Sequence, residues 1–408
     1  MTTVRARPLW AGRTLALLAI ALLALNMRTA VTSVSPIVEQ ISVDIPLGSV
    51  ALGVLGMLPA IMFALAGLFS PGLARRIGLE ATLVVACVLI VAGFLVRAAA
   101  TEYSMFLVSS AVALVAMGIG NVLLPAAVKR YFPDRIGLLT SVYVTLLAIS
   151  TTIPAAISAP VADAASWRVS MLVWAGLGLT ALVPWMAVLV QHRRSLVATA
   201  AEEAPEVEVP GKELLARLLR SRTAWALAMS MGTSSLSAYT MFAWLPPMLT
   251  DWAGLSQGAA GALLSVYALV GLPLGLLFPF LTQRAKNGAW LVLIGAAQLA
   301  ISYTGLLLVP ALAPLWVVLA GGPILFPVTL TLINLRTRDH VVTAATSGFA
   351  QGIGYTVAGL GPLLFGVLFE VSGDWALPLV FLLCTSLGAF VAGILLLKNR
   401  MVDDELVR

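Results

Sequence analysis

Twelve apolar stretches, each long enough to cross a bilayer, constrain the fold of this 408-residue chain more than any motif does. A helix rises 1.5 Å per residue and the hydrocarbon core is about 30 Å thick, so a span needs about 20 apolar residues. Only 10% of the residues are charged, against about 25% in a soluble domain. The stretches cover approximately 13–38, 47–70, 79–99, 104–129, 136–160, 167–190, 223–249, 257–282, 288–309, 314–335, 343–369 and 375–397. We therefore expect an all-α membrane protein with 12 transmembrane helices. The first stretch lacks a small-residue cleavage site, so we expect it to be retained.

The distribution of basic residues predicts the orientation of these helices. Segments on the amino-terminal side hold 21 of the 24 Lys and Arg residues, whereas the opposite side holds only Arg97 and Arg168. Basic residues are enriched in cytoplasmic loops, so we expect both termini to be cytoplasmic. The net charge of +6 then follows from topology and gives no indication of a nucleic-acid partner.

A long polar segment divides the chain between the sixth and seventh stretches. Its second part, 211–220, has four leucines at helical spacing with basic residues opposite, which predicts a short helix on the membrane surface. A faint internal repeat supports two related halves, because Pro125, Asp134-Arg135 and Ser141 are echoed by Pro327, Arg338-Asp339 and Ser347. We predict a six-helix half over 1–190, a cytoplasmic linker over 191–222 and a second six-helix half over 223–408.

Arg28 is the one formal charge near the middle of a predicted helix. It lies about 22 Å into the first helix when counted from Arg13. A guanidinium at the bilayer centre costs about 2.5–3.5 kcal/mol on insertion scales, and it keeps its proton. We therefore expect Arg28 to face a polar cavity or a substrate. The alternative interpretation is that it bonds to the carbonyl groups of a kinked helix.

Several short motifs resemble those of one family of transporters. Residues 71–78 follow the pattern G-x-L-a-D-R-x-G of the loop after the second helix, except that Arg75 stands where the aspartate usually does. Other matching segments are Asn26-Met27-Arg28, 120–125, 129–135, Phe326-Pro327, 335–337 and 351–355. In order and position they resemble the major facilitator superfamily over nearly the whole chain, and within it the cyanate and nitroimidazole porters. The resemblance implies a transporter built from two six-helix halves. The departure at Arg75 leaves the usual cytoplasmic gate ion pair of this half in question.

Polar side chains at several depths in the helices form the predicted substrate site. In transporters with two related halves, the substrate lies near the midplane at the interface of the repeats. The predicted substrate-binding residues are Arg28, Asn26, Asn121, Tyr143, Tyr239, Tyr267, Gln351 and Tyr355. An arginine with hydroxyl and amide donors and no carboxylate suits a small anion or a polar planar molecule. The amides and tyrosines could instead bond to or pack on a neighbouring helix, and Trp244 is expected in the interfacial aromatic belt.

Charged residues of the predicted cytoplasmic loops are candidates for gating. They are Arg75, Arg76, Lys129, Arg130, Asp134 and Arg135. The basic pairs are interpreted first as topology signals, and gating is the second interpretation.

Proton-carrying groups are absent from the middle of the predicted helices. The acidic residues nearest the membrane are Glu39 and Glu370, at the outer ends of the first and eleventh helices, and both histidines fall in predicted loops. Buried carboxylates and histidines mark proton relays in transporters. We therefore expect no dedicated proton carrier, and Glu39 is the one residue that would contradict this.

These observations predict a secondary transporter that moves a small anion or a small polar organic molecule by alternating access. The sequence has no nucleotide-binding loop, metal cluster or activated nucleophile, so we expect neither enzymatic activity nor a cofactor. Cys87 and Cys384 lie in apolar runs and are expected to be core residues. We expect a monomer in the bacterial inner membrane, with the lipid bilayer and a small molecule as its partners. Two alternatives stay open, a multidrug or metabolite exporter of the same fold and, more distantly, a membrane-embedded sensor or scaffold.

Overall fold

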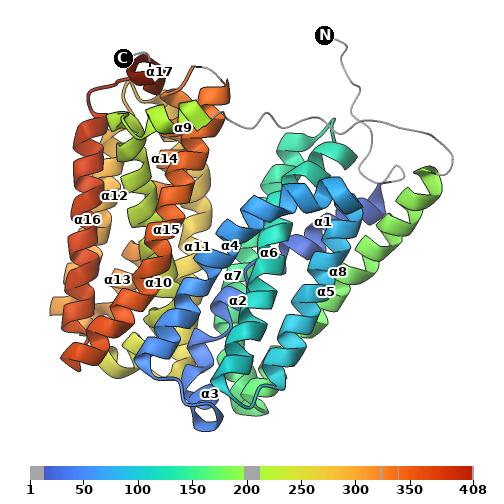
Figure 1. The fold of residues 1–408 in the computed structure, drawn as a ribbon. Coiled ribbons are helices and arrows are strands. Elements are labelled where there is room, and N and C mark those ends of the chain that lie inside the picture. The colour runs from blue at the N-terminus through green and yellow to red at the C-terminus, as the bar shows by residue number, and fades with distance from the viewer. Residues whose placement is uncertain (1–12, 197–211, 322–323, 339, 407–408) are drawn as a thin grey trace. The chain divides into compact units, whose positions relative to one another are not determined.

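The computed structural model describes residues 13–196, 212–321, 324–338 and 340–406, and this part of the chain contains helices and no strand. The chain forms two compact units (Figure 1). Unit 1 comprises residues 1–47 and 61–204, and unit 2 comprises residues 48–60 and 205–408. The long helix α4 (Ser49–Ile77) therefore begins in unit 2 and continues in unit 1.

Unit 1 is built from short helices at its start and long helices after them. Its elements are α1 (Thr14–Ala24), α2 (Thr29–Thr32), the 3-10 helix η1 (Ser35–Ile37), α3 (Val38–Asp44), the main part of α4, α5 (Leu79–Ala98), α6 (Tyr103–Tyr131), α7 (Ile136–Ala164) and α8 (Trp167–Leu196). The core of the unit lies where α5 packs against α6 and α8, and where α1 packs against α8.

The first helix is interrupted, which corrects the expectation of one continuous helix over 13–38. It ends at Ala24, and residues 25–28 form turns. The chain is helical again in the short α2, bends at residues 33–34, and continues through η1 into α3, which ends at Asp44. The Asn26 amide supplies a local reason, because its Nδ2 donates to the carbonyls of Leu22 (2.8 Å) and of Leu177 in α8 (3.3 Å). Asparagine side chains compete in this way with helical backbone bonding.

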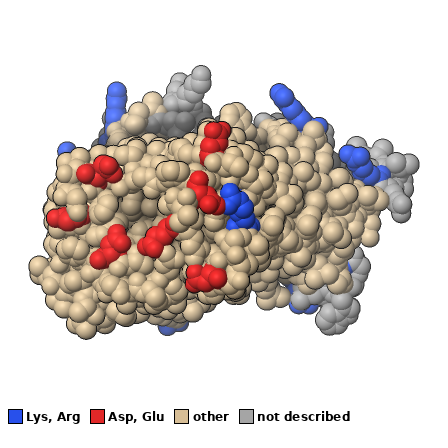
Figure 2. All heavy atoms as spheres, turned by 90° about the horizontal axis from the view of Figure 1, so that it is seen from below, with Lys and Arg blue, Asp and Glu red and all other residues tan. Residues whose placement is uncertain are grey.

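Acidic side chains are exposed on the face of the molecule that Figure 2 shows. The exposed acidic residues of unit 1 include Glu39, Asp44, Glu102 and Asp163. Asp44 accepts hydrogen bonds from Trp167 Nε1 (2.9 Å) and from the Arg168 guanidinium. These hydrogen bonds, from Arg168 first and then from Trp167, hold the pKa of Asp44 below its usual range. The contacts tie α3 to the beginning of α8.

Unit 2 contains the remaining long helices and two short helices near the ends of its chain. Its elements are α9 (Lys212–Leu218), α10 (Arg222–Ala253), α11 (Gln257–Arg284), α12 (Trp290–Leu308), η2 (Pro310–Leu312), α13 (Ala313–Ala320), α14 (Leu325–Leu335), α15 (His340–Ser372), α16 (Ala376–Leu396) and α17 (Val402–Leu406). The stretch expected as one helix over 314–335 is therefore two helices, and residues 322–323 between them lie outside the described part.

Within the described residues, eleven helices are long and apolar enough to cross a membrane. The seventh predicted stretch, α10, is not among them. Its sequence includes Thr233-Ser234-Ser235, Ser237 and Thr240, all of them buried, and these hydroxyl-bearing residues lower its mean hydropathy. Small polar residues of this kind are common where membrane helices pack closely.

The pairing of α10 with α15 forms the centre of unit 2. A methyl group added at Gly361 would lie 2.6 Å from Leu236 and 2.7 Å from Thr240, so the glycine permits the close approach. Trp244 is 2% exposed, and its Nε1 donates to the Pro362 carbonyl (2.9 Å). The expectation that Trp244 belongs to an interfacial belt is therefore wrong, because the ring is buried beside Trp375, 5.9 Å away between centroids.

Candidate functional site

Arg28 lies at the break between α1 and α2, where the chain is not helical. The guanidinium carbon is 4.8 Å from the centre of the Phe63 ring, which is a cation–π distance. Its Nη1 is buried and has no hydrogen-bond partner among the described residues. A buried donor on a permanent cation is costly to leave unpaired. Arg28 is thus a charged donor available to an acceptor that is not part of the described protein.

The other predicted residues of unit 1 differ in their surroundings. Asn26 is fully buried, and its Nδ2 is bonded to two backbone carbonyls, so the amide holds the helix break against α8. Its Oδ1 is buried without a partner in the described structure. Asn121 in α6 and Tyr143 in α7 are half-buried. Within the described part of unit 1, neither of these two side chains forms a hydrogen bond or ring contact with Arg28.

Three of the predicted residues in unit 2 lie along the α10–α15 pair. Tyr239 of α10 and Tyr355 of α15 pack edge to face, with ring centres 6.4 Å apart and planes at 67°. Gln351 lies one turn before Tyr355, and its Nε2 donates to Ser347 Oγ at 2.9 Å. Residues four apart share a helix face, so Ser347, Gln351 and Tyr355 form one polar line on α15.

Tyr267 lies deeper in unit 2 than the sequence suggests. It is 2% exposed, and its ring packs edge-on against Phe242 at 5.7 Å. Next to it in the core, the Ser237 hydroxyl of α10 is hydrogen-bonded to the Tyr303 hydroxyl of α12. The arrangement makes Tyr267 part of the helix packing.

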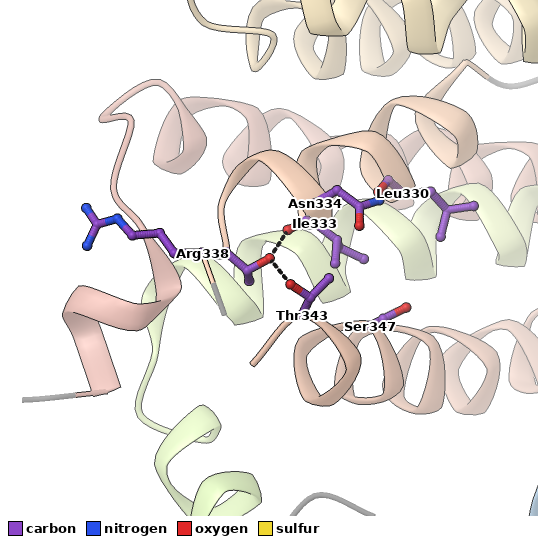
Figure 3. A pocket seen from close by; sticks show the side chains of 7 residues that line it. Leu330, Ile333, Asn334, Arg338, Thr343 and Ser347 are labelled. Carbon is purple, nitrogen blue, oxygen red and sulfur yellow. Dashed lines mark hydrogen bonds between the residues drawn. The ribbon is translucent and has the colours of Figure 1, made fainter. Parts of the chain in front are cut away.

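A cavity of about 640 Å³ opens between α14 and α15 (Figure 3). It is lined by Leu330, Ile333, Asn334, Thr337, Arg338, Thr343 and Ser347. Ser347 also accepts the Gln351 amide, so the cavity adjoins the polar line on α15. No sequence motif marks these lining residues as a site, although Arg338 and Ser347 belong to the internal repeat.

Asp134 forms an ion pair that the sequence did not predict. Its Oδ1 lies 2.5 Å from Arg13 Nη1 and its Oδ2 lies 3.1 Å from Arg13 Nη2. The hydrogen bond to Asp134 raises the pKa of the Arg13 guanidinium. Arg135 Nε lies 3.9 Å from the same carboxylate. The predicted gating residue Asp134 thus joins the beginning of α1 to the α6–α7 connection, within unit 1.

Arg130 belongs to a second charged cluster in unit 1, centred on Glu80. Glu80 is 1% exposed, and it accepts the Tyr131 hydroxyl at 2.6 Å and lies 3.3 Å from Arg130 Nε. His192 Nε2 is 3.8 Å from the same carboxylate and 3.2 Å from Arg130 Nη2. Burial, together with the hydrogen bond to Glu80, raises the pKa of Tyr131 above its usual range. The Tyr131 hydroxyl therefore stays protonated and donates its hydrogen bond to the Glu80 carboxylate.

Two expectations about titratable groups are corrected by this cluster. Glu80, in the first turn of α5, is a buried carboxylate, whereas Glu39 and Glu370 are both exposed. His192 lies on α8, which continues to Leu196, and not in a loop. An isolated carboxylate in the first turn of an apolar helix is the sequence signal that could have identified Glu80.

The remaining predicted gating and coupling residues are Arg75, Arg76, Lys129 and Glu39. Arg76 is exposed, and the side chains of Arg75 and Lys129 lie outside the described part. Glu39 is exposed in the first turn of α3, beyond the helix break.

Arg97 is a buried cation that the sequence analysis assigned to the far side of the membrane. It is 1% exposed in the last turn of α5, where its Nε donates to Ser110 Oγ at 3.0 Å and its Nη1 reaches the Ala30 carbonyl at 3.5 Å. Phe94 and Phe106 flank the guanidinium at 5.5 and 5.2 Å. Arg97 thus donates hydrogen bonds to the protein, whereas Arg28 Nη1 has no hydrogen-bond partner among the described residues.

The family of the chain is decided by comparison with known proteins. Residues 16–321 match the profile described as Major Facilitator Superfamily. The chain belongs to the Major Facilitator Superfamily. Its fold, with eleven candidate membrane spans, and its relatives identify it as a multi-pass membrane transporter of that superfamily.

Curated relatives of this superfamily member cover most of its length. The uncharacterized transporter YycB of Bacillus subtilis (strain 168) is 31% identical over 91% of this chain and 90% of its own length. The 2-nitroimidazole transporter of Escherichia coli (strain K12) is 30% identical over 92% of this chain and 93% of its own length. The cyanate transport protein CynX of the same organism is 27% identical over 88% of this chain and 92% of its own length. The resemblance to cyanate and nitroimidazole porters is therefore confirmed.

A solved structure supports the superfamily fold independently. A bacterial homolog of the human lysosomal transporter Spinster, in its inward-facing and occupied conformation, superposes with a TM-score of 0.74. The match covers 95% of this chain and 96% of that chain at 15% sequence identity, so it bears on the fold alone.

Proposed function

We propose that the chain is a secondary transporter that moves a small anion, or a small polar planar molecule, across the bacterial inner membrane by alternating access. The observation that carries the proposal is Arg28, which lies at a break in the first membrane helix. Its Nη1 is buried and has no hydrogen-bond partner among the described residues. A permanent cation with an unused donor in this position is explained by an acceptor on the substrate.

The substrate class follows from Arg28 together with the relatives. The guanidinium offers a planar fork of donors, and Phe63 supplies an aromatic face beside it. Cyanate, and a nitroimidazole with its planar ring and nitro oxygens, both suit such donors, and relatives at 27% and 30% identity are named for these compounds. Asn26 acts in this proposal by fixing the break that presents Arg28.

In unit 2, we propose Tyr239, Gln351 and Tyr355 as substrate contacts, with Tyr267 as their support. The edge-to-face tyrosine pair and the Gln351–Ser347 hydrogen bond place three polar groups along two helices. Asn121 and Tyr143 remain proposed contacts of unit 1, since both are half-buried.

We propose that α10 is the twelfth membrane span and that both termini are cytoplasmic. At 32 residues, α10 is longer than a helix needs to be to cross the bilayer. Its hydroxyl groups are buried within unit 2; for example, Ser230 Oγ is hydrogen-bonded to Thr329 Oγ1 at 2.6 Å. The charge bias of the loops supports the orientation. The proposed organisation is a six-helix half over 1–190, a cytoplasmic linker over 191–222 and a six-helix half over 223–408.

We propose that the two charged clusters of unit 1 act in gating. One cluster contains Asp134, Arg135 and Arg13, and the other contains Arg130 and Glu80. We further propose that the protein works as a monomer, without a cofactor and without catalysing a reaction. An exporter of larger drugs is the competing proposal, and it differs in the breadth of compounds carried.

Uptake by the purified protein in liposomes tests the proposed function. Radiolabelled cyanate and 2-nitroimidazole are offered in counterflow, with and without a pH gradient. We expect saturable uptake that excess unlabelled cyanate or 2-nitroimidazole inhibits and that larger cationic drugs do not inhibit. Inhibition by a broad set of drugs would favour the exporter, and no uptake of either compound would contradict the proposal.

A further inference from the structure

The cavity between α14 and α15 is lined by hydrogen-bonding groups at the end of unit 2 that carries α17 (Figure 3). Its volume of about 640 Å³ falls in the range of small-molecule sites, about 300–1,000 Å³. Leu330 and Ile333 supply the apolar wall, and Asn334, Thr337, Thr343 and Ser347 supply the polar wall.

The hydrogen bonds around the cavity determine which groups face an occupant. Asn334 Nδ2 donates to the Leu330 carbonyl at 3.0 Å, which leaves its Oδ1 to accept. Ser347 Oγ accepts the Gln351 amide, and its own proton can be donated. Thr337 donates to the Ile333 carbonyl at 2.8 Å, so Thr343 is the donor in the 2.7 Å contact between the two hydroxyls. The polar wall therefore offers both acceptors and donors.

The charge that lines the cavity is turned away from it. Arg338 Nη1 lies 2.7 Å from Asp404 Oδ1 and Nη2 lies 3.3 Å from Asp404 Oδ2, and the backbone N–H of Arg338 donates to Asp403. Figure 3 shows the guanidinium directed away from the other lining side chains. The C-terminal helix α17 thus neutralises the one cation of the lining and keeps it out of the cavity.

A row of polar side chains on α15 connects the cavity with the proposed substrate contacts of unit 2. Thr343, Ser347, Gln351 and Tyr355 follow one another at intervals of four on α15, so each side chain lies about one turn beyond the one before it. The Gln351–Ser347 hydrogen bond joins the two parts of this line. A polar line along a membrane helix is expensive unless it faces a cavity or a substrate path.

We propose that this cavity is a second binding position for substrate, on the cytoplasmic side, and that it takes small uncharged molecules that both donate and accept hydrogen bonds. The proposal rests on the proposed function. The two binding positions differ in chemistry. Arg28 offers a cationic donor to an anionic or electron-rich group, whereas the cavity offers uncharged donors and acceptors. A weak acid in its protonated form, or an uncharged nitrogen heterocycle, fits the cavity.

Sided transport measurements test this second position. Everted membrane vesicles present the cytoplasmic side, and right-side-out vesicles present the outer side. The half-saturation concentration is measured on each side for 2-nitroimidazole, at a pH that keeps its ring uncharged, and for the cyanate anion. The variants are Asn334→Leu and Thr343→Val. Thr356→Val is the matched control, because Thr356 lies on the same helix but donates to the Gly352 carbonyl and does not line the cavity.

Loss of one hydrogen bond corresponds to a weakening of about 3- to 10-fold. We expect each cavity variant to raise the cytoplasmic half-saturation concentration of 2-nitroimidazole by that factor. For the cavity variants, the half-saturation concentration of 2-nitroimidazole on the outer side and that of cyanate on both sides should stay within about twofold of wild type. For Thr356→Val, every half-saturation concentration should stay within the same limit. Melting temperatures near wild type establish that both variants fold.

Four results would overturn the proposal. Unchanged cytoplasmic values, or equal changes on both sides, would show that the cavity is not a separate position. An equal change for cyanate would show that the assigned chemistry is wrong. Absence of wild-type uptake from either side would instead contradict the proposed function and the second position together.

Discussion

The Arg13 guanidinium and the Asp134 carboxylate, 121 positions apart in the chain, form two hydrogen bonds of 2.5 and 3.1 Å. The Asp134 side chain is 4% exposed and that of Arg13 is 16% exposed. Arg13 Nη1 also donates to the Tyr131 carbonyl at 3.2 Å. The pair therefore fixes the start of α1 against the end of α6, beside the Glu80–Tyr131 hydrogen bond.

We expect Asp134→Asn to lower the stability of the protein by about 2–3 kcal/mol, because it weakens charge-assisted hydrogen bonds and leaves Arg13 without its carboxylate. Arg13→Gln should have a similar effect, and the double variant should cost less than the sum of the two. The measurement is the melting temperature of each purified variant in a double-mutant cycle. Additive losses would mean that the two side chains do not interact in solution.

Arg28→Ala should abolish most substrate binding and leave the melting temperature of the ligand-free protein near wild type. Arg28→Lys should also lose binding, because an ammonium lacks the planar fork of the guanidinium. Binding is measured by equilibrium titration with cyanate and 2-nitroimidazole.

Arg97 is the matched control for Arg28, since both arginines are buried or half-buried in unit 1. Arg97→Met should lower the melting temperature, because Ser110 and the Ala30 carbonyl lose their partner. Unfolding of Arg28→Ala, or normal binding by it, would assign Arg28 a structural role.

Glu39→Gln should respond to a pH gradient as the wild type does. The carboxylate is exposed on α3, beyond the break in the first helix, so it is poorly placed to carry protons through the protein. Glu370→Gln is the control, because Glu370 is an exposed carboxylate near the C-terminal end of α15. If Glu39→Gln alone lost gradient-driven accumulation while counterflow persisted, Glu39 would be a proton carrier.

Single cysteines at positions 195 and 256, in a background without Cys87 and Cys384, test the orientation. We expect an impermeant thiol reagent to label position 256 in intact cells and position 195 only after the membrane is opened. The physical reason is the enrichment of Lys and Arg on the cytoplasmic side. Labelling of position 195 from outside would reverse the proposed topology.

Glu405 should contribute stability at neutral pH and lose it in acid. Burial raises the pKa of this carboxyl, but hydrogen bonds from Ser221 and Thr223 hold it below its usual value. Such a group stabilises the folded state above its unfolded pKa of about 4.3, and the contribution is lost as the pH falls through the folded value. The melting-temperature difference between wild type and Glu405→Gln should therefore be full near pH 7 and shrink as the pH drops below about 4. A difference that is independent of pH would contradict a role for the ionised carboxylate.

Part of the candidate site could be predicted from local sequence, because a charge in an apolar run is costly wherever the chain folds. That reasoning identified Arg28 and the line formed by Gln351 and Tyr355. It could not show that the Asn26 amide at the helix break also donates to the Leu177 carbonyl, because this contact depends on how α8 packs against α1. It also overlooked Glu80, whose burial depends on Arg130, Tyr131 and His192 from two other helices.

The sequence by itself determined the class of fold and the distribution of charge, because the length and composition of an apolar stretch are properties of consecutive residues. It also determined the family, through motifs whose order is preserved along the chain. Only the tertiary structure decided which polar groups have partners. Arg97 donates to Ser110, whereas Arg28 Nη1 has no partner among the described residues. The cavity beside Ser347 is lined by side chains that come from both α14 and α15. Hydrogen bonding and burial are set by residues distant in sequence, and no local pattern records which of them meet.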